Sequence, residues 1–153
     1  MKKIKAGIIG ATGYAGSELV RILARHPRAE IGLLTSETYA GRPFSDVYPL
    51  FRGTVDMKCA ELDLKTAGRG LDVVFVCLPH TKSMDAVPLL LKQGSRIVDL
   101  GGDFRLKKAD EYEKWYGAAH AAPEFLKDSV YGLPELHARE IARAKLVANP
   151  GCY

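Results

Sequence analysis

The first part of the chain alternates between short apolar runs and a segment with helical spacing. Residues Ile4 to Ile9 form an apolar run that ends at a glycine, as a buried strand would. From Ser17 to His26, apolar residues recur at helical spacing until Pro27 ends the pattern. A second strand is predicted from Ala29 to Ser36. These elements predict a strand, helix and strand unit with parallel strands and a right-handed crossover.

The middle of the chain contains a continuous apolar run, Asp72 to Leu78. Such a run is typical of a strand covered on both faces, so we expect it near the centre of a parallel sheet. The next predicted element is a helix that Thr81 or Ser83 caps and that continues through Lys92. Another strand is predicted from Arg96 to Leu100.

The remaining segments are shorter and more polar. We expect helices from Ala109 to Tyr116 and from His137 to Ala144, and a last strand from Lys145 to Ala148. Between Gly41 and Gly70 the pattern indicates only a packed excursion of irregular or short elements. The alternation predicts an α/β fold with a doubly wound, mostly parallel sheet of the NAD(P)-binding Rossmann type.

The composition is that of a soluble globular domain. The 153 residues are 47% hydrophobic and 26% charged, which excludes a disordered or collagen-like chain. The net charge of +4 comes from 22 basic and 18 acidic residues, spread without a basic stripe, so we expect no nucleic-acid partner. No stretch approaches the ~18 apolar residues of a membrane span, and no signal-peptide core is visible, so we expect no membrane association.

The three cysteines, Cys59, Cys77 and Cys152, match neither a zinc site nor a disulfide framework. We therefore expect reduced thiols, a cytoplasmic location and no bound metal. Cys152 follows the turn-forming pair Pro150-Gly151, where a thiolate would be a nucleophile. A buried, inert thiol is the alternative for Cys152 and the preferred interpretation for the other two.

A glycine-rich loop follows the first strand and precedes the first helix. In a Rossmann turn, glycines make the bend, let the backbone approach a pyrophosphate and let the helix pack on the strand. The spacing here is G-x-x-G-x-x-G, which departs from G-x-G-x-x-G, and a structural turn without a ligand is the alternative. The candidate cofactor-binding residues are Gly10, Ala11, Thr12, Gly13, Tyr14, Ala15 and Gly16.

The end of the second strand favours NADP over NAD. An acidic residue there would bind the ribose 2′-hydroxyl, but the sequence places hydroxyl groups at Thr35 and Ser36. Ser36 and Arg42 could supply donors and positive charge to a 2′-phosphate. Glu37 would favour NAD if it points inward, and Arg42 could instead be a solvated loop residue.

Six short blocks along the chain carry a family resemblance. They are Gly10 to Gly16, Leu34-Thr35-Ser36 with Ala40-Gly41, Leu78-Pro79-His80, Asp99-Leu100 with Asp103-Phe104-Arg105-Leu106, Tyr131-Gly132-Leu133-Pro134-Glu135, and Asn149-Pro150-Gly151-Cys152-Tyr153. Together they resemble the N-acetyl-gamma-glutamyl-phosphate reductase family of arginine biosynthesis, and the resemblance covers the whole chain.

The resemblance implies an enzyme of the aspartate-semialdehyde dehydrogenase type, in which residues 1–153 are the NADP-binding Rossmann domain. In this family a second α/β domain follows, and the full-length enzyme is expected to be a homo-oligomer. Cys152 is then the nucleophile that attacks an acyl phosphate, and NADPH reduces the resulting thioester to N-acetylglutamate semialdehyde. The histidine that acts as acid and base belongs to the second domain, so the isolated chain is expected to bind the cofactor without efficient turnover.

The resemblance also adds candidate residues outside the glycine loop. Leu78, Pro79 and His80 lie at the predicted carboxyl end of a strand, where ligands bind in open α/β sheets, and are candidate cofactor contacts. Arg105 could bind a substrate carboxylate or phosphate, although an ion pair with Asp103 is an equal alternative. This chain has Gly101-Gly102 where the family has serine and alanine. The other histidines, His26, His120 and His137, are expected at the surface.

Three other functions compete with this hypothesis. Aspartate-semialdehyde dehydrogenase and the aminoadipyl-phosphate reductase of lysine synthesis use related chemistry. The Pro150-Gly151-Cys152-Tyr153 ending favours the arginine enzyme. The third alternative is a nucleotide-binding module without chemistry, in which Cys152 serves packing only.

Overall fold

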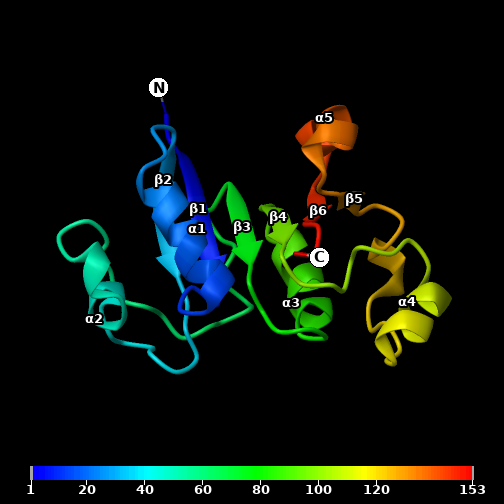
Figure 1. Cartoon of the computed structure of the whole chain (residues 1–153), viewed down its shortest axis with the longest axis horizontal. Helices are drawn as coiled ribbons and strands as arrows, with labels where there is room; N and C mark the ends of the chain where they lie inside the picture. The colour runs from blue at the N-terminus through cyan, green and yellow to red at the C-terminus, as the bar shows by residue number, and fades with distance from the viewer. Residues whose placement is uncertain (1, 153) are drawn as a thin grey trace.

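The computed structural model describes residues 2–152, and a sheet of six parallel strands forms its centre (Figure 1). The strand order is β2-β1-β3-β4-β6-β5, which places β3 in the interior of the sheet as predicted. All neighbouring strands pair in parallel, so the doubly wound α/β fold is confirmed. The strands are β1 (Ile4–Ile9), β2 (Ala29–Leu34), β3 (Val73–Val76), β4 (Arg96–Asp99), β5 (Val130–Tyr131) and β6 (Leu146–Ala148).

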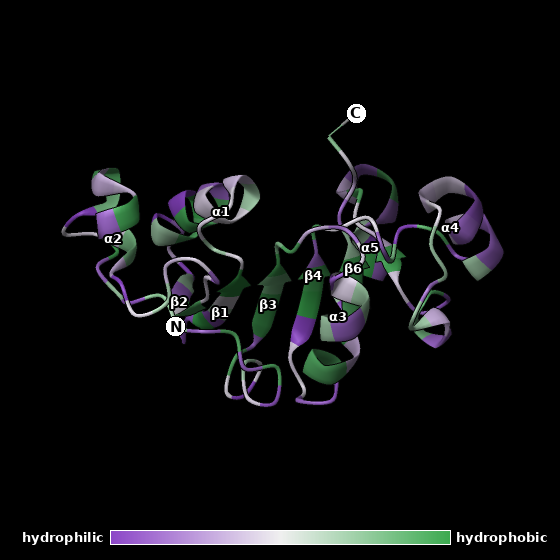
Figure 2. Ribbon diagram, turned by 90° about the horizontal axis from the view of Figure 1, so that it is seen from below, coloured by the Kyte–Doolittle hydropathy of each residue, from purple (hydrophilic) through white to green (hydrophobic). Residues whose placement is uncertain are grey.

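Helices connect these strands and cover both faces of the sheet. Helix α1 lies on one face and α3 on the other (Figure 2). No helix in the part of the chain that the structure describes is both long and apolar enough to cross a membrane. The helices are α1 (Tyr14–Ala24), α2 (Phe44–Val47), α3 (Ser83–Leu91), α4 (Ala109–Tyr116) and α5 (Pro134–Arg143), with short 3₁₀ turns η1 (Pro49–Phe51) and η2 (Pro123–Phe125).

The hydrophobic core has two parts, one on each face of the sheet. On the α3 face, Val74 and Val76 of β3 pack with Val87 and Leu90 of the helix. On the α1 face, Ile8 packs with residues of α1, β2 and the excursion from Gly41 to Gly70. Both faces of β3 therefore contribute to cores, which explains its unbroken apolar run.

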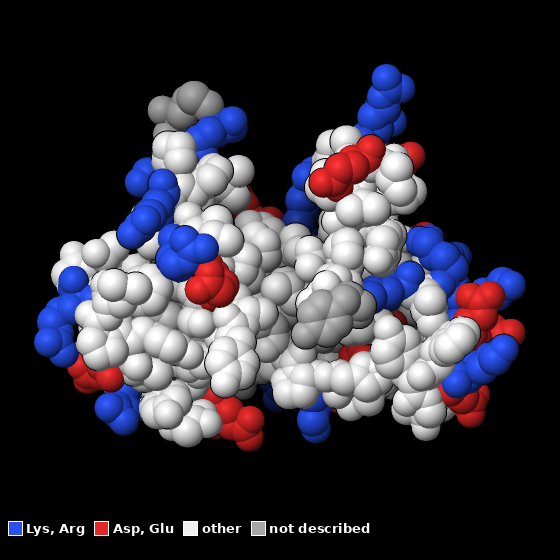
Figure 3. All heavy atoms as spheres, viewed as in Figure 1, with Lys and Arg blue, Asp and Glu red and all other residues white. Residues whose placement is uncertain are grey.

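A row of apolar residues crosses the α1 face, and only part of it is covered. Leu34 and Ile8, at one end, are fully buried, whereas Val98 and Val147 are only half-buried and line an open hollow of about 650 Å³. Figure 3 shows charged side chains mainly around the rim of the molecule in this view, with uncharged atoms over its middle. The row, in strand register, is Leu34, Ile8, Phe75, Val98, Val147 and Val130.

Element boundaries differ from the predictions at several points. Helix α1 begins at Tyr14, inside the glycine loop, and not at Ser17. The predicted cap of α3 is wrong, because neither Thr81 nor Ser83 caps it; Ser83 instead donates its hydroxyl to Asp99. The last helix begins at Pro134, a favoured first residue because proline lacks the N–H that a helix start leaves unpaired. The two-residue strand β5 was not predicted.

Candidate functional site

The glycine loop is built around two positions where a side chain cannot fit. Gly10 follows β1 with φ +76°, and a Cβ there would lie 2.5 Å from the carbonyl oxygen of Cys77. A Cβ at Gly16, inside α1, would lie 2.3 Å from the carbonyl oxygen of Gly10. Gly13 is exposed, and a Cβ there would meet its nearest neighbour at 3.5 Å. Gly10 and Gly16 therefore bring β1, β3 and α1 together, and Gly13 faces solvent.

The start of α1 offers unpaired backbone donors. The first N–H groups of any helix lack intrahelical partners and carry partial positive charge. The first turn contains no acidic residue that would compete for them. Tyr14 and Ala15 are exposed there, while Ala11 and Gly16 are buried beneath the loop. This arrangement suits an anion such as a pyrophosphate.

Hydrogen bonds join the glycine loop to the end of β2. The hydroxyl groups of Thr12 and Ser36 lie 2.7 Å apart, and Tyr48 donates its hydroxyl to the Thr12 carbonyl at 2.7 Å. The Gly10 N–H donates to the Thr35 hydroxyl at 3.2 Å, and the Tyr39 N–H donates to the Ser36 hydroxyl. These bonds hold the two loops in one arrangement relative to each other.

A cleft of about 800 Å³ opens over these loops at the carboxyl ends of β1, β2 and β3. That is the edge of the sheet where open α/β folds bind ligands, and the volume suits a small-molecule site. Its walls include two carboxylates, Glu37 and Glu61. Arg42 does not line the cleft; its guanidinium lies 5.6 Å from the ring centre of Tyr39, which does. The predicted residues that line it are Gly10, Thr12, Gly13, Ser36, Leu78 and Pro79.

Cys152 lies just past the carboxyl end of β6 and is exposed. Arg105 reaches this segment, because its Nε donates to the Asn149 carbonyl at 2.8 Å and its Nη2 donates to the Leu100 carbonyl at 3.2 Å. Its Nη1 lies 3.0 Å from the position that a Cβ on Gly151 would take. Arg105 therefore links the turn before the thiol to Leu100, just past the end of β4, and does not pair with Asp103.

The other two thiols are less exposed, although Cys77 is only half-buried and lines the cleft. Cys59 is buried, and burial raises its pKa. Burial, with a smaller contribution from the charge of Asp99, raises the pKa of Cys77 to about 12. Both therefore stay protonated near neutral pH, and Cys152 is the one cysteine exposed to solvent in the part of the chain that the structure describes.

His80 belongs to a cluster centred on Asp103, which the pattern of the sequence did not indicate. Its Nδ1 lies 2.7 Å from Oδ1 of Asp103, and its Nε2 lies 3.2 Å from the Tyr112 hydroxyl. The Tyr112 hydroxyl donates to the same carboxylate oxygen at 2.8 Å. These residues come from three separate segments, so only the fold brings them together.

The surface position predicted for His120 is wrong, whereas His26 is exposed and His137 half-buried. His120 is 8% exposed, with Nε2 2.9 Å from the Asp103 carbonyl and Nδ1 accepting the Ala122 N–H. Burial lowers the pKa of His120. Because its ring nitrogens are satisfied within the fold, His120 is a structural residue.

A second buried carboxylate, Asp99, ends β4. Its Oδ1 accepts the Ser83 hydroxyl and the Gly101 N–H, whereas its Oδ2 has no hydrogen-bond partner among the described residues. Burial, with a smaller contribution from the charge of Asp103, raises the pKa of Asp99 to about 6. The hydrogen bonds from Ser83 and Gly101 and the charge of Arg105 act in the opposite direction. The charged form of Asp99 therefore lowers the free energy of unfolding near neutral pH.

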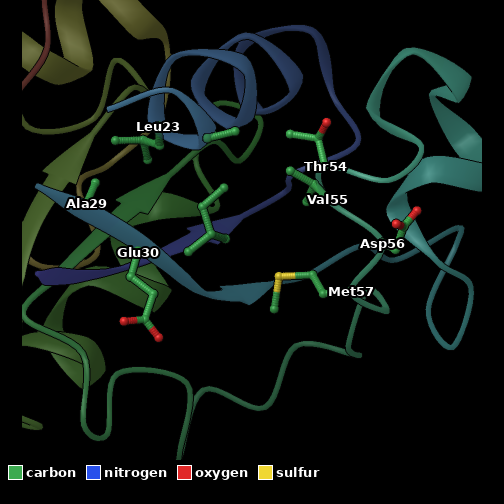
Figure 4. A pocket seen from close by; sticks show the side chains of 9 residues that line it. Leu23, Ala29, Glu30, Thr54, Val55, Asp56 and Met57 are labelled. Atoms are coloured by element: carbon green, nitrogen blue, oxygen red, sulfur yellow. The ribbon is translucent and has the colours of Figure 1, made fainter. Parts of the chain in front are cut away.

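Another hollow does not have the chemistry of a phosphate site. It measures about 350 Å³ and lies at the outer edge of the sheet, between α1, β2 and residues 54–57 (Figure 4). The charged groups that line it are the carboxylates of Glu30 and Asp56, without a lysine or arginine. No cluster of three or more metal-ligating side chains is found among residues 2–152.

Comparisons with known proteins agree with this geometry. Residues 5–144 match the family described as semialdehyde dehydrogenase, NAD binding domain. The N-acetyl-gamma-glutamyl-phosphate reductase of Heliobacterium modesticaldum is 50% identical over 150 residues, which are 98% of this chain and 43% of that protein. The enzyme of the same name from Pelotomaculum thermopropionicum is 51% identical over the same shares. The chain thus spans less than half the length of these relatives.

The solved structures that resemble the chain share its fold at low sequence identity. Aspartate semialdehyde dehydrogenase from Candida albicans, solved with NADP, has a TM-score of 0.68 at 20% identity and covers 97% of this chain and 42% of that one. The Vibrio cholerae aspartate semialdehyde dehydrogenase II complex has the same TM-score and identity. By sequence and by fold, the chain belongs to the semialdehyde dehydrogenase family, as an NAD-binding domain related to the N-acetyl-gamma-glutamyl-phosphate reductases.

Proposed function

We propose that this chain is the coenzyme-binding part of an NADP-dependent reductase that converts N-acetyl-gamma-glutamyl phosphate into N-acetylglutamate semialdehyde, a step of arginine biosynthesis. The observation that carries the proposal is the glycine loop, where Gly10 and Gly16 leave no room for a Cβ and the helix start faces the cleft. The names of the relatives at about 50% identity support the substrate. A homo-oligomeric full-length enzyme and a cytoplasmic location stay predictions.

The residues around the cleft fit a dinucleotide. The N–H groups at the start of α1 would hold the pyrophosphate, and Leu78 and Pro79 would form the wall opposite the loop. Ser36 lies in the cleft and Arg42 beside its Tyr39 wall, where they would bind a 2′-phosphate. Glu37, which also lines the cleft, is the group that would favour NAD instead. When bound, the reduced nicotinamide supplies a hydride.

Cys152 would perform the covalent chemistry. Its thiolate attacks the acyl carbon, the carbon–oxygen bond to phosphate breaks with its electron pair, and a thioester forms on the sulfur while inorganic phosphate leaves. After hydride addition to the acyl carbon, the carbon–sulfur bond breaks, the aldehyde leaves and the thiolate returns. Arg105 is placed beside Gly151, and its Nη1, without a hydrogen-bond partner in the described part of the chain, would bind the substrate phosphate or carboxylate.

The isolated chain is expected to perform only the first half of this reaction. It spans 43% of the relatives' length, and by the family resemblance the acid and base histidine lies in a second domain. We therefore expect coenzyme binding and a single acylation of Cys152, without sustained turnover.

The test is to mix the chain with N-acetyl-gamma-glutamyl phosphate, then measure released phosphate and the mass of each cysteine-containing peptide. We expect about one phosphate per chain and an acyl adduct on Cys152. Cys152→Ser should abolish both, and Cys77→Ser, the matched control, should change neither. Acylation elsewhere or none at all would contradict the assignment of the nucleophile, and sustained NADPH oxidation would contradict the need for a second domain. Faster acylation by aspartyl phosphate would contradict the substrate.

A further inference from the structure

Asp103 is a fully buried carboxylate that serves three donors from different parts of the chain. Its Oδ1 accepts the Tyr112 hydroxyl at 2.8 Å and the Thr81 N–H at 3.1 Å, and lies 2.7 Å from Nδ1 of His80. Its Oδ2 has no hydrogen-bond partner among residues 2–152. A buried carboxylate costs free energy unless its bonds compensate, so the three contacts to Oδ1 are what keeps this group in the fold.

Thr81 lies in a backbone conformation that its side chain disfavours. Its φ is +73°, and it is the one residue other than glycine with positive φ in the described part of the chain. A β-branched residue is strained in this region, and such strain persists only where surrounding contacts impose it. The contact that the structure shows is the bond from the Thr81 N–H to Asp103. Asp103 therefore holds the turn that follows β3.

The ring of His80 is fixed by the same cluster. It stacks on Tyr116 with ring centres 4.6 Å apart, and both ring nitrogens face Asp103 and Tyr112. Burial raises the pKa of Tyr112 and the bond to Asp103 raises it further, so its hydroxyl stays protonated and donates. His80 is thus oriented by Asp103 and by the ring of Tyr116, although 37% of its side chain is exposed.

This turn is directly connected to the wall of the cleft. Leu78 and Pro79, which line the cleft, immediately precede His80 and Thr81. A change in the turn would therefore move that wall relative to the glycine loop opposite.

We propose that Asp103 is a positioning residue, whose buried carboxylate holds His80 and the strained turn at Thr81 so that Leu78 and Pro79 form the coenzyme-binding wall before the coenzyme arrives. The proposal rests on the proposed function in one respect, that the ligand of the cleft is a nicotinamide dinucleotide. Preorganisation of this kind favours binding because the ligand does not have to order the loop.

The experiment combines coenzyme titration with a measurement of the turn in the absence of coenzyme. NADPH dissociation constants would be measured by fluorescence for Asp103→Leu, Tyr112→Phe and Thr81→Gly, with Glu113→Gln on the exposed face of α4 as the matched control. Hydrogen exchange of the Thr81 amide and the nitrogen chemical shifts of His80 would report the turn itself.

We expect Asp103→Leu, which removes the acceptor oxygen, to weaken NADPH binding at least about tenfold, to speed exchange of the Thr81 amide and to shift the His80 nitrogens. Tyr112→Phe should do the same to a smaller extent, which keeps the test informative if Asp103→Leu does not fold. Thr81→Gly should bind NADPH as well as the unmodified chain, because glycine adopts positive φ without strain. In the double variant, Thr81→Gly should restore most of the affinity that Asp103→Leu loses.

Two outcomes would overturn the proposal. One is a folded Asp103→Leu or Tyr112→Phe variant with unchanged NADPH affinity and unchanged Thr81 exchange. The other is weakened binding that Thr81→Gly fails to restore, which would assign Asp103 a role outside the turn. If the unmodified chain binds no NADPH, the proposed function fails, while the exchange and shift measurements still decide whether Asp103 holds the turn.

Discussion

Asp99 offers a stability test that depends on pH. Its carboxyl has an ordinary pKa of 3.8, which burial raises to about 6 in the folded chain. The folded state therefore binds a proton more tightly than the unfolded state, so stability falls as pH rises from about 4 to about 6 and stays reduced above that range. A difference of about 2 pKa units at 1.36 kcal/mol each gives a penalty of about 3 kcal/mol at neutral pH.

Substitution Asp99→Asn removes the titrating group and keeps an oxygen for the Ser83 hydroxyl and the Gly101 N–H. The free energy of unfolding would be measured by urea denaturation for both chains at pH 4 and pH 7.5. The variant should gain roughly 2–3 kcal/mol relative to the unmodified chain between these two pH values. Comparing the free energy of unfolding at the two pH values removes any effect of the new amide that does not depend on pH.

A control with the opposite sign is available at Asp63. This carboxylate is exposed, and a hydrogen bond from the Thr66 side chain, with a smaller contribution from the Lys65 backbone, lowers its pKa. Its contribution is present above the ordinary pKa of 3.8 and is lost as pH falls below it, so Asp63→Asn should lose relative stability as pH rises through the range below about 4 and should change little between pH 4 and pH 7.5. If the difference between Asp99→Asn and the unmodified chain is the same at both pH values, the buried carboxylate is not the source of the penalty.

Three further predictions concern the cleft and the thiol. Gly16→Ala should lower the free energy of unfolding by about 1–3 kcal/mol in urea denaturation, because its Cβ would meet the Gly10 carbonyl. Gly13→Ala should fold normally and weaken NADPH binding in a fluorescence titration. Iodoacetamide at pH 7.5 should modify Cys152 in the native chain and leave Cys77 unmodified until urea is added, as peptide masses would show; equal rates would contradict the raised pKa of the half-buried Cys77. Arg42→Ala should raise the dissociation constant of NADPH about tenfold and leave that of NADH unchanged, and an equal effect on both would exclude a 2′-phosphate contact.

The sequence predicted the elements whose periodicity reflects burial. The run at β3 was apolar throughout because both of its faces contribute to cores, and α4 was predicted with its observed bounds. The start of α1 was predicted three residues too late, because the glycine loop itself continues into the helix. The excursion between Gly41 and Gly70 was predicted to be packed, and its aromatic residues Phe44 and Phe51 do enter the α1-face core.

The side-chain clusters could not be predicted in the same way. His80, Asp103 and Tyr112 meet through bonds between separate loops, which leave no periodic signal in any one segment. His120 has a polar local sequence, yet a backbone carbonyl and a backbone N–H satisfy its ring and permit burial. The candidate cleft was easier to predict than these clusters. Its backbone contacts require glycine, because a side chain at Gly10 or Gly16 would not fit, and such glycines are visible in the sequence.

Titration of the folded chain with NADPH, followed by calorimetry and by the backbone amide signals, measures whether the glycine loop holds a dinucleotide. One NADPH should bind per chain, and the largest shifts should fall on the amides of Gly13, Tyr14 and Ala15 and on Ser36. Absence of binding at millimolar NADPH, or binding that leaves these four amides unchanged, would contradict the assignment of the cleft.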